Sequence, residues 1–148
     1  MTANKMLDET DIGILEILRK NARTPFLDIA KKLRISESTI RKRVKELEKE
    51  GVIKKYSAVV EPSKLGYGSV AVVGIDVKPE KFLEVAKKLT EFDNIKFVST
   101  STGDHMIMTE IWMENSHDLR DFISTKIEGI EGVTRTCPAI LMERLKEV

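Results

Sequence analysis

Five basic side chains and three hydroxyl groups gather in one short stretch of the sequence, residues 36–51. If the stretch is helical, a step of about 100° per residue places Ser38, Lys42 and Lys45 opposite its apolar residues. Lysine and arginine neutralise phosphates, and hydroxyls donate hydrogen bonds to them. We therefore expect the stretch to enter a groove of double-stranded DNA, and the alternative is a solvated helix face. The residues expected to contact DNA are Thr24, Ser36, Ser38, Thr39, Arg41, Lys42, Arg43 and Lys45.

A helix is the element that must hold these groups in place. Ser36 can cap its N-terminus, and Gly51 can end it in a left-handed conformation. Ile40, Val44 and Leu47, spaced four and three residues apart, form one narrow apolar face. The pattern predicts an amphipathic helix packed along that face, and we call residues 36–51 the recognition helix.

A second helix is expected directly before the recognition helix. Thr24 and Pro25 are typical of an N-cap followed by the first helical residue. The predicted buried face of this helix is Phe26, Ile29, Ala30 and Leu33. Only Arg34 and Ile35 separate it from Ser36, and so tight a connection predicts a helix-turn-helix.

A first helix precedes this pair. Either Asp8 or Thr10 can cap it, and Asp8 and Asp11 lie near its positive end. Its predicted apolar stripe is Leu7, Ile12, Leu15 and Leu18.

The residues after Gly51 predict a wing and then a hinge. Residues 52–60 are rich in β-forming types and lack helical periodicity, so we interpret them as a wing or strand. Lys54 and Lys55 can contact phosphates from it. The next nine residues hold one proline and two glycines, which is typical of a linker. The expected organisation is a winged helix-turn-helix DNA-binding domain in residues 1–60, a linker in 61–69 and a second domain in 70–148.

Charge divides between the same parts of the chain. Residues 1–60 hold 14 basic and 9 acidic residues, a balance of +5, whereas residues 61–148 hold 11 and 15, a balance of −4. A polyanionic partner is therefore expected for the first part alone. No apolar run reaches the ~18 residues of a membrane span, and the N-terminus has no signal-peptide core. We expect a cytoplasmic protein with no membrane partner.

The second domain alternates between strand and helix patterns. The predicted strands are residues 70–77, 95–102, 105–113 and 133–145. Helices are expected to begin at Lys78-Pro79 and at Asn115, so the order is βαββαβ, the ferredoxin-like split repeat, and the whole chain is α+β. Pro138 suits a strand at the sheet edge. One sheet face has no helix to cover its apolar side chains, which favours a C2 homodimer through that face.

The sequence shows no acid/base pair, no nucleophile with a base and no metal-binding cluster of the kind that catalysis needs. His105 and His117 fall in different elements, and Cys137 is the single cysteine. We expect a loop or pocket position for His105, a solvated position for His117 and a small buried hydrophobe at Cys137. No glycine-rich phosphate loop is present. We therefore expect no enzymatic activity, no cofactor and no metal site.

A series of short motifs runs along nearly the whole chain. They are Leu7-Asp8-x-x-Asp11-x-x-Ile14-Leu15, Asn21-Ala22-Arg23, Ile29-Ala30-x-x-Leu33, Ser36-x-Ser38-Thr39-x-x-x-Arg43-Val44-x-x-Leu47-Glu48-x-x-Gly51-Val52-Ile53, Thr102-Gly103-Asp104 and Gly132-Val133-x-x-Thr136. No single motif is specific, but in this order and spacing they resemble the Lrp/AsnC family of prokaryotic regulators, also called feast/famine regulators.

The resemblance implies a sequence-specific DNA-binding transcriptional regulator that a small molecule, an amino acid or related metabolite, modulates. In the family the second domain mediates dimerisation and further assembly, often to octamers, and the ligand binds at interfaces between these domains. The residues that match the family's ligand contacts are Ser101, Thr102, Gly103, Asp104, His105, Thr134 and Thr136.

Two departures from the family pattern leave alternatives open. Arg34 stands where many members have glycine or asparagine, and a left-handed residue with a side chain costs roughly 1 kcal/mol, so the turn can differ in shape. The family often has Gly-Asp-x-Asp in the ligand loop, whereas residues 103–106 read Gly-Asp-His-Met. The missing carboxylate weakens charge pairing with the ammonium group of an amino acid. Asp104 itself is either a turn former or a ligand contact. The alternatives are an architectural DNA-binding protein with a degenerate ligand site and an enzyme similar to sirohaem decarboxylases, which resemble the family in fold.

Overall fold

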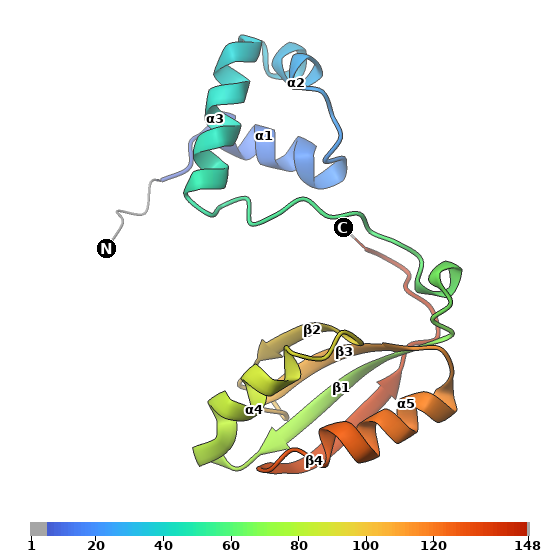
Figure 1. Cartoon of the computed structure of the whole chain (residues 1–148). Coiled ribbons are helices and arrows are strands. Elements are labelled where there is room, and N and C mark those ends of the chain that lie inside the picture. The colour runs from blue at the N-terminus through green and yellow to red at the C-terminus, as the bar shows by residue number, and fades with distance from the viewer. Residues whose placement is uncertain (1–5, 148) are drawn as a thin grey trace. The chain divides into compact units, whose positions relative to one another are not determined.

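A computed structural model describes residues 6–147 and divides the chain into two compact units (Figure 1). One unit comprises the chain up to Val59 together with the C-terminal residues from Lys146, and the other spans Val60–Leu145. Each has a hydrophobic core of its own. Among the described residues, no helix is both long and apolar enough to cross a membrane.

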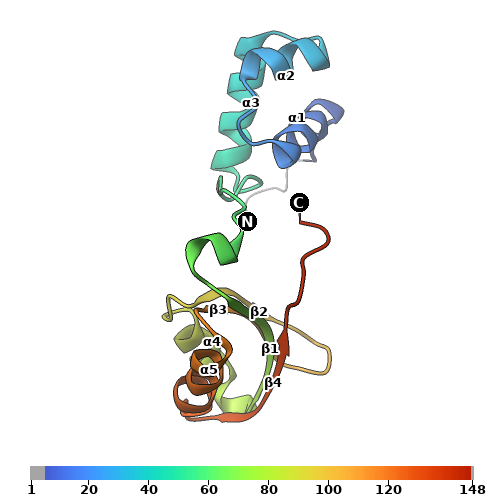
Figure 2. The same cartoon turned by 90° about the vertical axis from the view of Figure 1, so that its right-hand side faces the viewer.

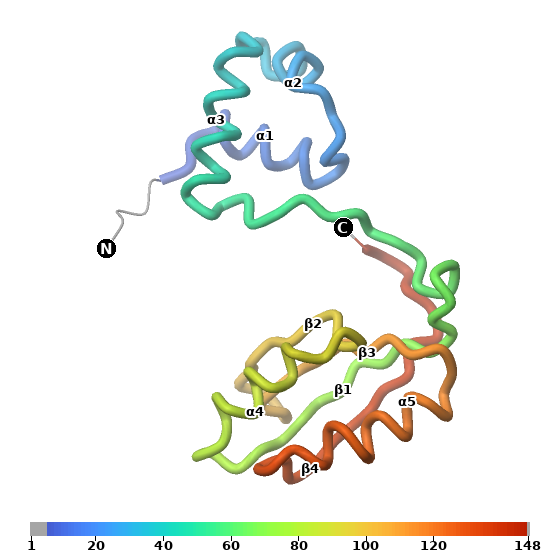
Figure 3. The backbone as a smooth tube through the Cα atoms, viewed as in Figure 1, coloured from blue at the N-terminus to red at the C-terminus, as the bar shows by residue number. Residues whose placement is uncertain are grey.

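Three helices build the first unit, and Figure 3 shows the path of the chain through them. They are α1 (Glu9–Lys20), α2 (Phe26–Leu33) and α3 (Glu37–Lys49). Ile40, Val44 and Leu47 are at most 2% exposed, which confirms the predicted apolar face of the recognition helix. They pack in one cluster with Ile14, Leu18, Ile29 and Ala30.

The start of α1 is as expected, but its predicted apolar stripe is partly wrong. Asp8 is the N-cap, and Asp8 and Asp11 each accept a hydrogen bond from the other's backbone in a capping box. Ile12 is 47% exposed, whereas Ile14, which the stripe omitted, is fully buried. The buried side of α1 instead runs through Asp11, Ile14 and Leu18. A carboxylate within the buried stripe hides its helical periodicity from the sequence.

The turn between α2 and α3 keeps the left-handed form despite its arginine. Arg34 has φ 57° and ψ 42°, and its backbone N–H donates to the carbonyl of Ala30. Ile35 donates to the same carbonyl at 3.1 Å. Ile35 also packs against the core of the unit. Core packing thus holds Arg34 in a conformation that its side chain disfavours.

The segment after α3 does not form the strand that its composition favours. Gly51 ends the helix with φ +71°, as expected, but residues 54–60 belong to no helix or strand. A strand needs a partner to accept its hydrogen bonds, and in this unit these residues have none. The Tyr56 hydroxyl instead donates to Glu48 of α3 at 2.7 Å. Burial and this hydrogen bond raise the pKa of Tyr56 to about 12.

The second unit has the expected βαββαβ order. Its strands are β1 (Ser69–Val77), β2 (Ile95–Thr100), β3 (Ile107–Met113) and β4 (Val133–Ile140). Its helices are α4 (Phe82–Leu89) and α5 (Ser116–Phe122), with short helical turns at Pro62–Leu65, Pro79–Lys81 and Ile123–Ile127. The sheet order is β2-β3-β1-β4, and every neighbouring pair is antiparallel. The predicted edge position of β4 is confirmed, and Pro138 pairs there with Val73.

Two strands end earlier than predicted, β2 at Thr100 and β4 at Ile140. Ile140 pairs with Ala71, two residues from the start of β1, so β1 offers almost no further partner. β2 stops at the loop that leads into β3.

Both long helices of this unit cover one face of the sheet (Figure 2). Alternate residues of β1 and β3 point into the core beneath them, among them Val73, Ile75 and Ile111, each fully buried. Thr109 is also fully buried, and its hydroxyl donates to the Val73 carbonyl at 3.0 Å. The remaining residues face the other side, which we call the open face. It includes Val70, Val72, Phe97, Met108 and Trp112.

Candidate nucleic-acid interface and ligand loop

The N-terminus of α3 holds three hydroxyl groups in one cluster. The Ser36 Oγ caps the helix by accepting from the backbone N–H of Thr39 at 3.2 Å. The same oxygen lies 2.7 Å from the Thr39 hydroxyl and 3.0 Å from the Ser38 hydroxyl. Helix N-termini attract anions because their backbone N–H groups and dipole are positive. These hydroxyls therefore line a terminus that suits a phosphate.

Three of the predicted cations lie on exposed sides of α3. Lys42 and Lys45 are exposed, and none of the ion pairs among the described residues involves them. Arg41 donates to Glu37 at 2.8 Å, and its guanidinium lies 5.3 Å from the centre of the Phe26 ring. This stacking across α2 and α3 orders the Arg41 side chain without burying it. Among the described residues of α3, Lys42 and Lys45 are thus exposed cations outside any ion pair, and Arg41 is a held cation.

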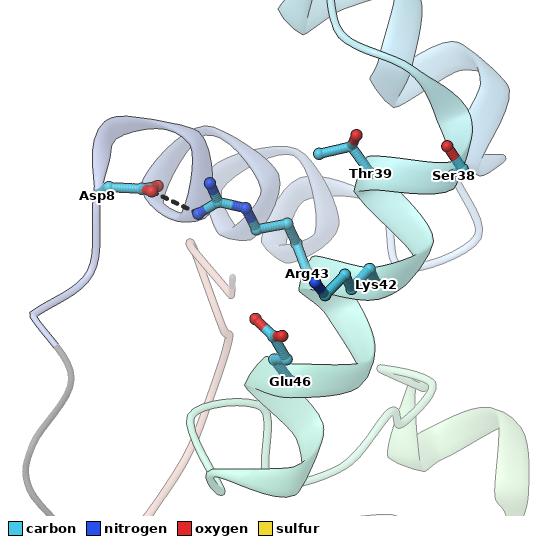
Figure 4. Close-up of a pocket in the computed structure, with 6 residues that line it drawn as sticks. All are labelled: Asp8, Ser38, Thr39, Lys42, Arg43 and Glu46. Atoms are coloured by element: carbon cyan, nitrogen blue, oxygen red, sulfur yellow. Dashed lines mark hydrogen bonds and ion pairs between the residues drawn. The ribbon is translucent and has the colours of Figure 1, made fainter.

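Arg43 points to a different neighbour. Its Nη1 donates to the carboxylates of Asp8 and of Asp11, the latter at 3.1 Å, as Figure 4 shows for Asp8. This hydrogen bond lowers the pKa of Asp8 and raises that of Arg43 from their ordinary values. A cleft of about 560 Å³ lies beside this contact. It is lined by Asp8, Ser38, Thr39, Lys42, Arg43 and Glu46.

Thr24 has a role other than the predicted N-cap. Pro25 is the residue before α2, with an extended ψ of 143°, and no side chain caps the helix. The Thr24 hydroxyl donates backwards to the carbonyl of Asn21 at 2.7 Å. The expected cap is therefore wrong by one residue, because the proline itself turns the chain into the helix. A cleft of about 400 Å³ is lined by Asn21, Thr24, Pro25, Asp28, Lys31 and Lys32. The sequence reasoning missed these two lysines, although they sit in the last turn of α2.

In the second unit, the predicted ligand loop joins β2 to β3. Residues 101–104 are exposed. The loop is closed by a backbone hydrogen bond of 2.9 Å from Ser101 to Met106, and the Ser101 hydroxyl donates to the His105 carbonyl. Asp104 makes no hydrogen bond or ion pair among the described residues. The carboxylate of the loop is thus open to solvent.

His105 leaves the loop and lies on the open face. Its ring covers Gly74 so closely that a Cβ on Gly74 would come 2.2 Å from the His105 Cδ2. Its Nδ1 lies 3.3 Å from both oxygens of Asp76, and Arg135 of β4 forms an ion pair with Asp76 at 3.2 Å. A glycine inside a strand often marks such a close approach. Asp76, Arg135 and Gly74 were missed in the sequence because they lie about 30 residues from His105.

The predicted strand contacts lie apart from His105. Thr136 pairs with the core residue Ile75, and its hydroxyl donates to Glu128 at 2.6 Å, on the face that the helices cover. Thr134 is exposed. The seven predicted ligand residues therefore divide between the loop, the open face and β4 rather than lining one cavity within this chain.

A three-helix unit whose last helix is basic and exposed fits the class of helix-turn-helix DNA-binding proteins, and here it is joined to a βαββαβ domain. Comparison with known proteins agrees with this class. Residues 7–54 match the family described as winged helix-turn-helix DNA-binding, and residues 70–148 match the Lrp/AsnC ligand binding domain. The match to a winged domain stops before most of the segment that forms no strand here.

The chain belongs to the Lrp/AsnC family of transcriptional regulators. It is 55% identical to the HTH-type transcriptional regulator LrpA of Pyrococcus horikoshii, over 95% of this chain and 100% of the relative. It is 40% identical to a Halobacterium salinarum regulator over 94% and 98% of the two chains. The structure of Escherichia coli AsnC superposes with a TM-score of 0.84 and 28% identity, covering 97% of each chain. These relatives are named regulators rather than enzymes, as the sequence led us to expect.

Proposed function

We propose that this regulator binds duplex DNA through the exposed side of α3, with Lys42 and Lys45 as its principal phosphate contacts. The observation that carries the proposal is the exposure of these two cations on a helix whose opposite side is buried. The hydroxyls at the start of α3 and the ordered Arg41 extend this surface. The proposed DNA contacts are Thr24, Ser36, Ser38, Thr39, Arg41, Lys42 and Lys45, and Arg43 is assigned another role below.

The salt dependence of DNA binding tests this proposal. Each neutralised phosphate contributes about 0.9 to the slope of log K against log salt. The Lys42→Ala, Lys45→Ala double variant should therefore bind more weakly and lose nearly two from that slope. The matched control is Lys87→Ala, Lys88→Ala, which removes two exposed cations from α4 of the second unit. A double variant with the control's affinity and slope would refute the proposal.

The second part of the proposal concerns the ligand. The exposed carboxylate of Asp104 can pair with the ammonium group of an amino acid, and the loop 101–105 supplies hydroxyl and backbone groups around it. The match to a ligand-binding domain supports a small-molecule effector, and the resemblance seen in the sequence supports the amino-acid class. Thr134 and Thr136 belong to the same proposed site if a second copy of the domain brings them beside a loop.

Calorimetric titration of the chain with the proteinogenic amino acids tests the ligand. We expect one of them to bind and Asp104→Ala to abolish the heat. Asp93→Ala, which removes an exposed acid before β2, is the control. If no amino acid binds while DNA binding is intact, the architectural alternative, which Met106 in place of a loop carboxylate favours, replaces the ligand proposal.

We further propose that the open face forms a homodimer, which assembles to a higher oligomer such as an octamer. Phe97, which is 53% exposed, Val72 and Trp112 give this face apolar area that one chain leaves in water. Two helix-turn-helix units would then meet a two-fold symmetric DNA site in the cytoplasm. Sedimentation should show a dimer or a higher multiple of it for the wild type, and a monomer for Val72→Glu. A wild-type monomer would contradict this part.

A further inference from the structure

We propose that Arg43 positions the recognition helix and makes no contact with DNA. The inference rests on the DNA binding proposed above and concerns one cation among those that the sequence places on the helix. The Arg43 side chain is 28% exposed, compared with 66% for Arg41 two residues earlier. Arg43 is therefore the arginine of α3 that the fold has drawn inward.

The partners of Arg43 are the two carboxylates of the α1 capping box. Its Nη1 reaches both Asp8 and Asp11. Asp11 is 2% exposed, and its carboxylate lies in the buried stripe of α1. A buried charge that loses its partner is strongly destabilising. If Arg43 moved to bind a phosphate, the buried carboxylate of Asp11 would lose its charged partner.

The contact fixes α3 at a point that matters for recognition. Figure 4 shows Arg43 reaching from α3 to the start of α1, while Ser38 and Lys42 project from other sides of the same helix. The capping box holds the two carboxylates rigidly, since each also accepts a backbone hydrogen bond. The ion pair thus sets how the exposed side of α3 is presented, and Asp8 and Asp11 neutralise the arginine at the edge of that side.

A rival account makes Arg43 a DNA contact that the two acids merely hold in the free protein. The two accounts differ in sign for the removal of an acid. If Arg43 contacts DNA, a weaker partner in α1 releases it, and binding tightens with a steeper salt dependence. If Arg43 positions α3, a weaker partner loosens the helix, and binding weakens although the protein has become more positive.

Asp8→Asn separates the accounts, because asparagine caps helices as well as aspartate does but carries no charge. Glu9→Gln is the matched control, since Glu9 is an exposed acid in the same first turn. Duplex binding by the full chain is measured by fluorescence anisotropy over a salt series. We expect Asp8→Asn to bind several-fold more weakly than Glu9→Gln with the same slope. Equal or tighter binding with a steeper slope would overturn the proposal.

Arg43→Met gives a second, independent test, because methionine keeps the apolar stem and removes the charge. We expect weaker binding with the wild-type slope, whereas Lys42→Ala should lose about 0.9 from that slope. Arg43→Lys, which restores a cation near both acids, should recover part of the affinity. A loss of about 0.9 in the slope of Arg43→Met would assign Arg43 to the phosphate contacts.

Circular dichroism at the assay temperature checks that each variant is folded. If Arg43→Met is unfolded, Asp8→Asn alone decides between the two accounts. The Lys42→Ala, Lys45→Ala variant tests the DNA-binding proposal independently of Arg43. If that variant keeps the affinity and slope of its control, the DNA-binding proposal fails, whatever the Arg43 variants show.

Discussion

The two units carry their functional groups in different ways. In the first, the proposed DNA contacts sit mainly on one continuous helix, so a single cap and a single buried face position nearly all of them. In the second, His105 comes from a loop, Gly74 and Asp76 from β1 and Arg135 from β4. A surface made by one element is robust to changes elsewhere, whereas a cluster drawn from three elements depends on the register of the sheet.

The first unit has one exception to this rule. Arg43 joins α3 to acids that lie 32 and 35 residues earlier in the chain. The exposed side of α3 is built from one continuous segment, but its orientation depends on a contact with residues far away in the sequence.

The largest expected effect tests whether the two units are independent. Ile40→Ala empties a fully buried position beneath α3, and such truncations cost about 2–5 kcal/mol. DNA binding should be lost. The single tryptophan, Trp112, lies in β3, so urea unfolding followed by its fluorescence should be unchanged while circular dichroism shows an earlier transition. Leu27→Ala, at a position 50% exposed, is the control. An equal shift of the tryptophan transition would mean that the units unfold together.

A smaller effect is expected where the second unit assembles groups from separate strands. Gly74→Ala should displace the His105 ring from the sheet and destabilise this unit by about 1–3 kcal/mol. In a His105→Ala background the same change should cost much less, since the clashing ring is gone. Gly103→Ala, where an added Cβ meets no atom within 4 Å, is the control. Trp112 fluorescence follows the unfolding of all these variants. If Gly74→Ala lowered the free energy of unfolding equally in both backgrounds, close packing of the His105 ring on Gly74 would not be the cause.

The turn before α3 should show a still smaller effect, confined to the first unit. Arg34→Gly relieves a left-handed φ, whereas Arg34→Ala removes the same charge but keeps the strain. We expect the glycine variant to be more stable than the alanine variant by about 1 kcal/mol. Thermal unfolding followed by circular dichroism measures the difference. A more stable alanine variant would show that the turn changes its shape.

The smallest effect concerns acid and the long-range contact of Arg43. The hydrogen bond from Arg43 holds the pKa of Asp8 below its ordinary value of 3.8. A lowered pKa stabilises the folded state above that value, and the contribution disappears as the pH falls through the lower, folded pKa. The wild type should therefore lose more stability than Asp8→Asn between pH 5 and pH 2. Melting temperatures across this range provide the measurement, and parallel curves would contradict the coupling.

The sequence predicted best what neighbouring residues decide. The cap at Ser36, the buried Ile40, Val44 and Leu47 and the stop at Gly51 all follow from spacing along one helix. The strand order also followed, because alternating periods specify the ferredoxin-like repeat.

The sequence failed where distant residues compete for the same group. A buried Asp11 broke the apolar stripe of α1, and its partner Arg43 resembled every other cation of the recognition helix. Residues 54–60 looked like a strand, but strand propensity cannot supply the partner that a ladder needs. The packing of the His105 ring on Gly74 depends on how the strands pair, and no local sequence pattern reveals that pairing.

The central claim is that DNA is held by the first unit and the small molecule by the second. The most direct measurement assays both kinds of binding on the same two variants of the full chain, Lys42→Ala, Lys45→Ala and Asp104→Ala. We predict that the lysine variant loses DNA affinity and retains the calorimetric heat of the amino acid, and that Asp104→Ala does the reverse. Loss of both activities in either folded variant would contradict the division.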